Sequence, residues 1–175
     1  MDKSVVIVDE VIKTLSIMDW KRVEYAARMI KYWCVKDHII YTFGNGGSAA
    51  IAAHFTTDLM KLGHGSECPM TNIALVTMIV NDLDNGFDNL FTELLNYNIH
   101  QYMSIVAFSV SGTSSNIERL ADFCHNNCVP NLFFTGRQQP FVYDINTIRI
   151  PSQNPRVVEP IFSIITHQII ESLDE

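Results

Sequence analysis

The sequence predicts an α/β fold, a three-layer sandwich in which helices cover both faces of a five-stranded, mainly parallel sheet. Two observations lead to this prediction. Short runs of β-branched and aromatic residues alternate along the chain with longer segments of helical periodicity. In addition, residues 104–110 are almost entirely apolar, which is typical of a central parallel strand buried on both faces.

Two helices are expected before the first strand. Apolar side chains recur at near-helical spacing over residues 4–18 and again over residues 20–35. The length of 175 residues suits one domain spanning 1–175. The apolar faces of the two helices are large for a domain of this size. We therefore expect residues 1–36 to pack against another copy of the chain and residues 37–175 to form the α/β core. Ordinary packing of the two helices on the sheet is the alternative.

A glycine-rich turn follows the first expected strand, at residues 38–43. Gly44, Gly46 and Gly47 interrupt regular structure, and Ser48 stands at the expected N-cap of an alanine-rich helix. Free backbone N–H groups and the helix dipole favour an anion at such a turn. The sequence therefore predicts a phosphate or carboxylate site, with a tight turn that binds nothing as the alternative. The spacing matches neither a Walker A loop nor a Rossmann glycine motif.

The remaining elements follow in order after a loop at residues 64–69. The further expected strands are 72–76, 104–110, 130–136 and 144–150. The further expected helices are 87–100, 116–127 and a last one from about Pro160, since proline is favoured at a first helical position, to Leu173. A second turn rich in serine follows the strand at 104–110. Because ligands bind beyond the carboxyl ends of parallel strands, we expect both turns to converge on one ligand.

Several polar side chains could carry chemistry. The hydroxyls of small residues on the two turns suit the acceptor oxygens of a phosphate, although serines that merely cap helices are the alternative. His54 and Asp58 are four residues apart on one helix face, where they could share a metal ion or a proton-transfer site, or form an ordinary surface hydrogen bond. His167, flanked by isoleucines, would by itself be interpreted as a core histidine.

Composition and charge argue against several classes of protein. The net charge of −7 argues against a nucleic-acid partner or an anionic membrane surface. No apolar run is long enough to span a bilayer. The apolar run near the N-terminus is short and is followed at once by acidic residues, which is unlike a signal peptide. We therefore expect a cytoplasmic protein. Cys124 and Cys128 could supply two metal ligands, but no second pair completes a zinc site; reduced thiols, with Cys34 and Cys68, are the preferred interpretation.

Three blocks, in this order along nearly the whole chain, resemble the phosphoheptose isomerases of the sugar isomerase (SIS) domain family. The blocks are residues 44–48 followed by His54 and Asp58, residues 109–116, and Glu159 with His167. The resemblance implies an isomerase that converts a ketose phosphate, sedoheptulose 7-phosphate, to an aldose phosphate through a cis-enediol, in the synthesis of lipopolysaccharide or capsule precursors. It also implies a homo-oligomer, a tetramer with active sites at subunit interfaces.

The resemblance implies roles for individual residues. Asp58 would be a carboxylate base, and His167 a second acid–base group. Zinc would be held by His54, Asp58, Glu159 and His167, although eight helical residues between the last two rise about 12 Å. The substrate and its phosphate would be bound by Asn45, Gly46, Gly47, Ser48, Asp82, Ser109, Ser111, Ser114 and Asn116.

This chain departs from the family pattern at four positions. Asp58 stands where Glu is usual, Glu159 where Gln is usual, and Ile51 and Arg156 where Asp is common. These changes keep the phosphate site and alter the sugar site. A related sugar phosphate is therefore one alternative. A non-catalytic SIS protein, either a sugar-phosphate sensor or a replication-initiator-associating regulatory protein, is a second, and a structural assembly protein is a third.

Overall fold

The computed structural model describes residues 3–72, 86–96, 101–136 and 146–174. Its centre is a five-stranded sheet with the order β2-β1-β3-β4-β5, in which every pair of neighbouring strands is parallel. The strands are β1 (Ile39–Gly44), β2 (Ser66–Glu67), β3 (Met103–Ser109), β4 (Asn131–Thr135) and β5 (Thr147–Arg149). The predicted five-stranded parallel α/β architecture is confirmed.

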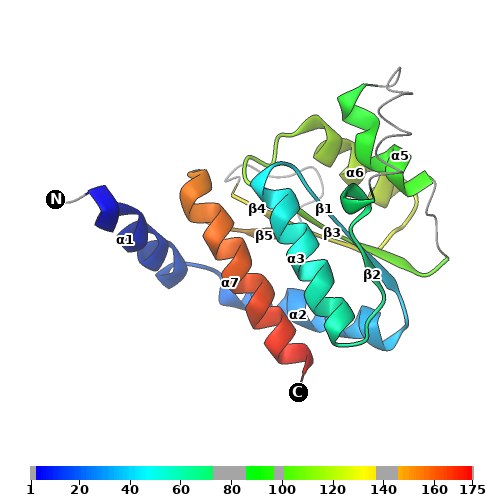
Figure 1. Ribbon diagram of the computed structural model, residues 1–175, viewed down its shortest axis with the longest axis horizontal. Coiled ribbons are helices and arrows are strands. Elements are labelled where there is room, and N and C mark those ends of the chain that lie inside the picture. Colours follow the sequence, from blue (N-terminus) through cyan, green and yellow to red (C-terminus); the bar gives the residue numbers. More distant parts are fainter. Residues whose placement is uncertain (1–2, 73–85, 97–100, 137–145, 175) are drawn as a thin grey trace.

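Helices form a layer on each face of this sheet (Figure 1). One face is covered by α2 (Trp20–Val35), α3 (Gly47–Lys61) and α7 (Pro155–Leu173). The other is covered by α5 (Leu90–Asn96) and α6 (Ser115–Asn126), with a short 3-10 helix at Phe87–Asn89 before α5 and another at Pro69–Thr71.

The central strand β3 shows why two helical layers are needed. Val106 and Phe108 pack into the core under α3 and α7, whereas Ile105 and Ala107 pack under α5 and α6. Side chains alternate between the faces of a strand, so an apolar strand can only be buried if both faces are covered. All seven residues of β3 are buried, as its apolar sequence predicted.

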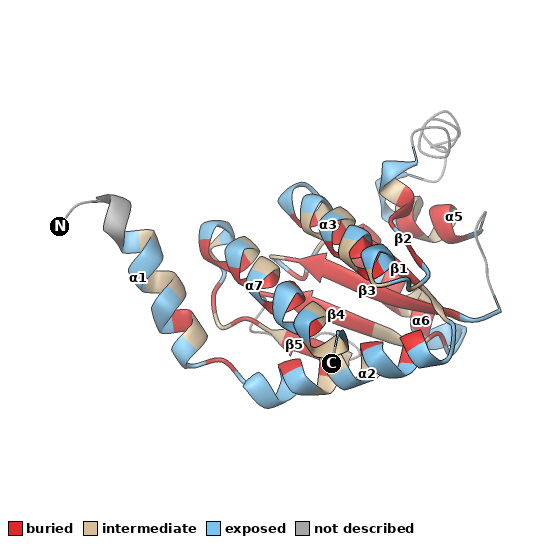
Figure 2. Cartoon of the chain, turned by 60° about the horizontal axis from the view of Figure 1, so that its bottom comes forward, coloured by how far each residue is buried: buried red, intermediate tan, exposed pale blue. Residues whose placement is uncertain are grey.

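The two N-terminal helices are present, and the first has few buried side chains. Helix α1 (Lys3–Ser16) extends away from the sheet and contacts α7 (Figure 2). Val8, Ile12 and Ile17, the last just beyond α1, are more than half exposed, at 57%, 60% and 62%. In contrast, α2 buries Ile30 and Trp33 in the main core.

One short strand was not expected from the sequence. Residues 66 and 67, expected in a loop, form β2, which pairs with Ile40 and Tyr41, and the Ser66 hydroxyl donates to the Ile40 carbonyl oxygen (2.9 Å). Two residues are too few to show the alternation by which a strand is recognised in sequence. The expected strand at 72–76 lies, apart from Asn72, outside the described residues.

The last helix begins at Pro155 and not near Pro160. The Asn154 side chain accepts a hydrogen bond from the Arg156 backbone N–H (3.2 Å), which is an N-cap, and Pro155 occupies the first helical position. Pro160 therefore lies inside the helix, and Glu159 belongs to α7 and does not end the preceding loop. No helix in the described part of the chain has the length and apolar character needed to cross a bilayer.

Candidate active site

A cavity of about 610 Å³ lies beyond the carboxyl ends of β1 and β3. The two strands end side by side, because Gly44 pairs with Phe108 in the sheet register. The turns that follow them, β1–α3 and β3–α6, therefore meet at the cavity, together with the start of α7. The lining residues are Asn45, Gly46, Gly47, Ser48, Phe108, Ser109, Val110, Ser111, Thr113, Ser114, Gln153, Pro155 and Glu159.

The β1–α3 turn depends on its glycines. A Cβ on Gly44 would lie 2.5 Å from the Ser48 carbonyl carbon and oxygen, and Gly46 has a positive φ of 52°. Gly46, and not Ser48 as expected, is the N-cap of α3, and it makes no side-chain cap. The first N–H groups of a helix have no partner within the helix, so this turn presents donors to an anion at the cavity.

The β3–α6 turn holds its serines in place through local hydrogen bonds. The Ser109 hydroxyl oxygen accepts from the Gly112 N–H (3.1 Å), and the Ser111 oxygen accepts from the Thr113 N–H (3.2 Å). Ser114 is the N-cap of α6 but makes no side-chain capping hydrogen bond. Capping therefore does not occupy its hydroxyl, and this turn can present several small donors to a phosphate.

An amide pair joins the two turns. Asn45 Nδ2 donates to Asn116 Oδ1 and Asn116 Nδ2 donates to Asn45 Oδ1, both at 2.9 Å. Asn116 is completely buried and does not line the cavity, whereas Asn45 is half-buried and does. Asn116 thus contacts the other turn and not the cavity. Asp82, the remaining residue of the expected binding set, lies outside the described residues.

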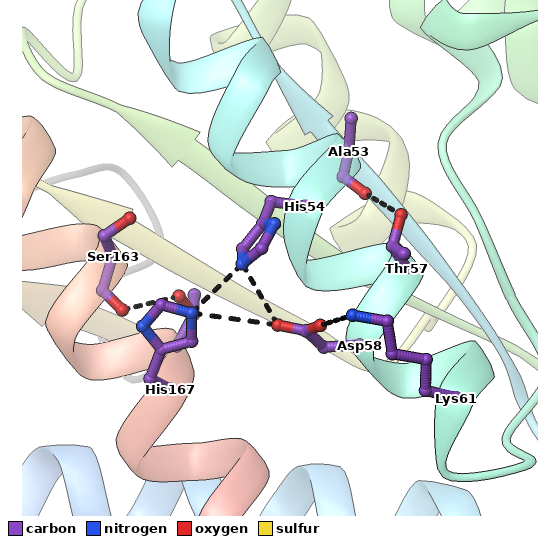
Figure 3. A network of polar contacts seen from close by, with 8 residues as sticks. Ala53, His54, Thr57, Asp58, Lys61, Ser163 and His167 are labelled. Atoms are coloured by element: carbon purple, nitrogen blue, oxygen red, sulfur yellow. Dashed lines mark hydrogen bonds and ion pairs between the residues drawn. The ribbon is translucent and has the colours of Figure 1, made fainter.

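A second group of polar side chains lies between α3 and α7, which run side by side (Figures 1 and 3). His54 and Asp58 come from α3 and His167 from α7. His54 Nε2 is 3.0 Å from His167 Nε2 and 3.2 Å from Asp58 Oδ2, and His167 Nε2 is 3.8 Å from the same oxygen. The interpretation of His167 as a core histidine is wrong, because its side chain is 58% exposed.

The spacing of these three atoms is compatible with a metal ion. Ligand bonds of about 2.0–2.1 Å in a tetrahedron place the ligand atoms about 3.4 Å apart, close to the three distances in this group. Three protein ligands also leave a fourth position open, as in catalytic metal sites. Glu159 is not part of the group, and lies instead at the cavity, eight residues from His167 along α7.

Lys61 completes the polar network around Asp58. Its Nζ is 2.9 Å from Asp58 Oδ1, on the opposite side of the carboxylate from the histidines (Figure 3). Burial acts to raise the pKa of Asp58, but the Lys61 hydrogen bond and the charges of His54, Lys61 and His167 outweigh burial and lower it. Asp58 is therefore held as a carboxylate.

Some residues of the site were not anticipated from the sequence. Lys61 is three residues from Asp58, a helical spacing that could have identified it. Gln153 and Pro155 line the cavity from a segment with no recognisable motif. Of the departures from the family pattern, Ile51 packs against the main core and Arg156 is exposed at the start of α7.

Residues 5–128 match the model of the SIS domain, which is most of the chain, so this protein belongs to the SIS domain family. Among curated proteins, the phosphoheptose isomerase of Colwellia psychrerythraea is 24% identical over 164 residues, which are 87% of this chain and 82% of the relative. These matches confirm the resemblance to phosphoheptose isomerases that the three sequence blocks indicated.

Solved structures of phosphoheptose isomerases share the fold. The enzyme from Neisseria gonorrhoeae aligns with a TM-score of 0.78 at 21% identity, covering 98% of this chain and 93% of the other. The enzyme from Francisella tularensis aligns with a TM-score of 0.79 at 20% identity, covering 97% and 92%.

Proposed function

We propose that this protein is an aldose–ketose isomerase of a phosphorylated sugar, with sedoheptulose 7-phosphate as the ketose and a heptose 7-phosphate as the aldose. The observation that carries the proposal is the cavity at the joined ends of β1 and β3, lined by two turns with small donors. The enzyme class follows from the curated relatives, which are phosphoheptose isomerases and match this chain over most of its length.

The phosphate would be bound by neutral donors. Among the described residues, none that lines the cavity carries a positive charge. Backbone N–H groups of the β1–α3 turn and hydroxyls of Ser48, Ser109, Ser111 and Ser114 would therefore hold the phosphate oxygens, with help from the helix dipoles. The Asn45–Asn116 pair would keep the two turns at a constant separation around the ligand.

Isomerisation through a cis-enediol needs groups that move one proton between neighbouring carbons and one between their oxygens. We propose Asp58 and His167 as members of this acid–base set, and His54, Asp58 and His167 as ligands of a divalent ion, with zinc the best match to a His/carboxylate set. A zinc ion bound there would polarise the carbonyl oxygen of the sugar.

We further propose a cytoplasmic homo-oligomer, a tetramer, that supplies precursors of surface polysaccharides. The exposed apolar side chains Val8, Ile12 and Ile17 on and next to α1 support an interface between copies of the chain. Three of the four cysteines are buried as free thiols, which suits a reducing compartment.

The test is an isomerase assay on the purified protein with sedoheptulose 7-phosphate, with and without added zinc. Asp58→Asn and His167→Ala are the test variants, and His64→Ala is a control histidine outside the cluster. Turnover that is lost in both variants and retained in the control supports the proposal. Saturable binding of the sugar phosphate without turnover would instead indicate a non-catalytic binding protein.

A further inference from the structure

We infer that Lys61 is a positioning residue of the proposed metal site, because its hydrogen bond orients the Asp58 carboxylate so that one oxygen, Oδ2, faces the two histidines. The inference rests on the proposed function, in which His54, Asp58 and His167 hold a divalent ion. A lysine ammonium group has donors and no acceptor, so Lys61 cannot itself bind a cation. Its part is to orient a side chain that can.

The Asp58 carboxylate needs a partner to fix its orientation. The torsion that rotates the carboxylate of an aspartate is broad, unlike the staggered torsion next to the backbone. His54 Nε2 and His167 Nε2 approach the same oxygen, Oδ2, at 3.2 and 3.8 Å, and leave Oδ1 unconstrained. Lys61 Nζ lies 2.9 Å from Oδ1. The lysine and the histidines therefore hold opposite oxygens of the carboxylate and together fix its rotation.

The end of α3 places Lys61 where it can make this contact. Lys61 is the last residue of the helix and lies three residues after Asp58, a spacing at which side chains meet. A positive charge is also favoured at a helix C-terminus. The side chain of Asp58 is 13% exposed and that of Lys61 is 67% exposed. The lysine therefore reaches the carboxylate from the solvent, on the side away from the histidines (Figure 3).

Removal of Lys61 would have two opposite effects on metal binding. Its positive charge repels a cation, so loss of the charge would tighten binding. Its hydrogen bond orients a ligand, so loss of the bond would weaken binding, and partners of metal ligands typically change metal affinity by about 10–100-fold. Because the ammonium group is mostly exposed, water and salt screen its charge. We therefore expect the loss of orientation to outweigh the loss of repulsion.

The test measures the binding of cobalt(II), by its visible absorption, to the purified protein after metal has been removed with a chelator. Lys61→Met removes the donor and keeps the length of the side chain, and Lys61→Arg keeps a charged donor. Lys21→Met, on an exposed lysine near the start of α2, is the matched control. Urea unfolding of the metal-free proteins shows whether the fold is preserved.

For Lys61→Met we expect the dissociation constant of cobalt to rise by about 10–100-fold. Lys61→Arg should recover at least part of this loss, and the control should bind cobalt as the wild type does. The urea midpoint of all three variants should stay close to that of the wild type, because exposed ion pairs contribute little to stability.

Four results would overturn the inference. A cobalt affinity of Lys61→Met within about threefold of the wild type would show that the contact does not orient Asp58. Tighter binding would show that Lys61 acts only by repulsion, and no recovery in Lys61→Arg would show that the donor is not what matters. Weaker binding with a clearly lower urea midpoint would indicate a general disturbance of α3.

Failure of the proposed metal site itself would look different. A wild-type protein that binds no cobalt, or an Asp58→Asn variant that binds it as tightly as the wild type, would refute the site and this inference with it. The four results above arise only in a protein whose wild type binds cobalt through Asp58.

Discussion

The amide pair between the two turns leads to a quantitative prediction about stability. Asn45 and Asn116 exchange two hydrogen bonds of 2.9 Å, and each buried hydrogen bond contributes about 0.5–1.5 kcal/mol net. Asn116→Ala removes both and leaves the amide of Asn45, which is half-buried and can be hydrated. We therefore expect the free energy of unfolding to fall by about 1–3 kcal/mol.

Asn45→Ala should cost as much or more, although its side chain is more exposed. It leaves the amide of Asn116 without its partner at a completely buried position, and an unsatisfied buried group costs about 1–3 kcal/mol. Once one partner has been removed, removing the other costs little more. The double variant should therefore be less destabilised than the sum of the two single variants, by about 1–2 kcal/mol.

The assay is urea unfolding at 25 °C of the wild type, both single variants and the double variant. The three variants should bind sugar phosphate more weakly than the wild type, because the turns are no longer joined. A coupling energy below about 0.3 kcal/mol, which is the additivity expected of independent sites, would refute the reasoning. It would show that the two amides do not depend on each other in solution.

Three further predictions follow from other parts of the molecule. The pKa of Asp58 is lowered, so its carboxylate stabilises the fold above the ordinary carboxyl pKa, and this stabilisation is lost as the pH falls. Urea unfolding between about pH 6 and pH 3 should therefore show a steeper loss of stability in the wild type than in Asp58→Asn. Phe108→Ala removes a completely buried ring that packs with Phe134 and Phe162, and should lower the free energy of unfolding by about 3–5 kcal/mol, measured by chemical denaturation. Ile12→Glu places a charge on the exposed apolar side of α1 and should shift the protein towards smaller species in light scattering, whereas an unchanged mass would exclude this surface from the interface.

Local patterns were sufficient to predict much of the fold. The apolar run of β3 predicted burial on both faces, and all its residues are buried. In contrast, the start of α7 was misplaced, because two prolines compete for the first helical position and only the Asn154 cap distinguishes them. The short strand β2 was missed, since it is defined by its pairing with β1 and not by its own two residues.

For the site, local sequence patterns were enough to predict the two turns and the placement of His54 and Asp58 on one face of α3. Glycine spacing and helical periodicity are local properties of a chain, so these features needed no knowledge of distant residues. The order of strands and helices likewise placed both turns at the carboxyl edge of the sheet.

The packing of the helices, which no local pattern shows, places the polar residues of α7 at two different sites. The packing of α7 against α3 brings His167 to Asp58, and the rise of the helix carries Glu159 to Gly47 at the cavity. The family resemblance assigns Glu159 and His167 to one zinc site, because a sequence match records which residues occur and not how far apart they lie. The rise of α7 between Glu159 and His167 keeps the two side chains at different places, since a rigid helix cannot fold back on itself.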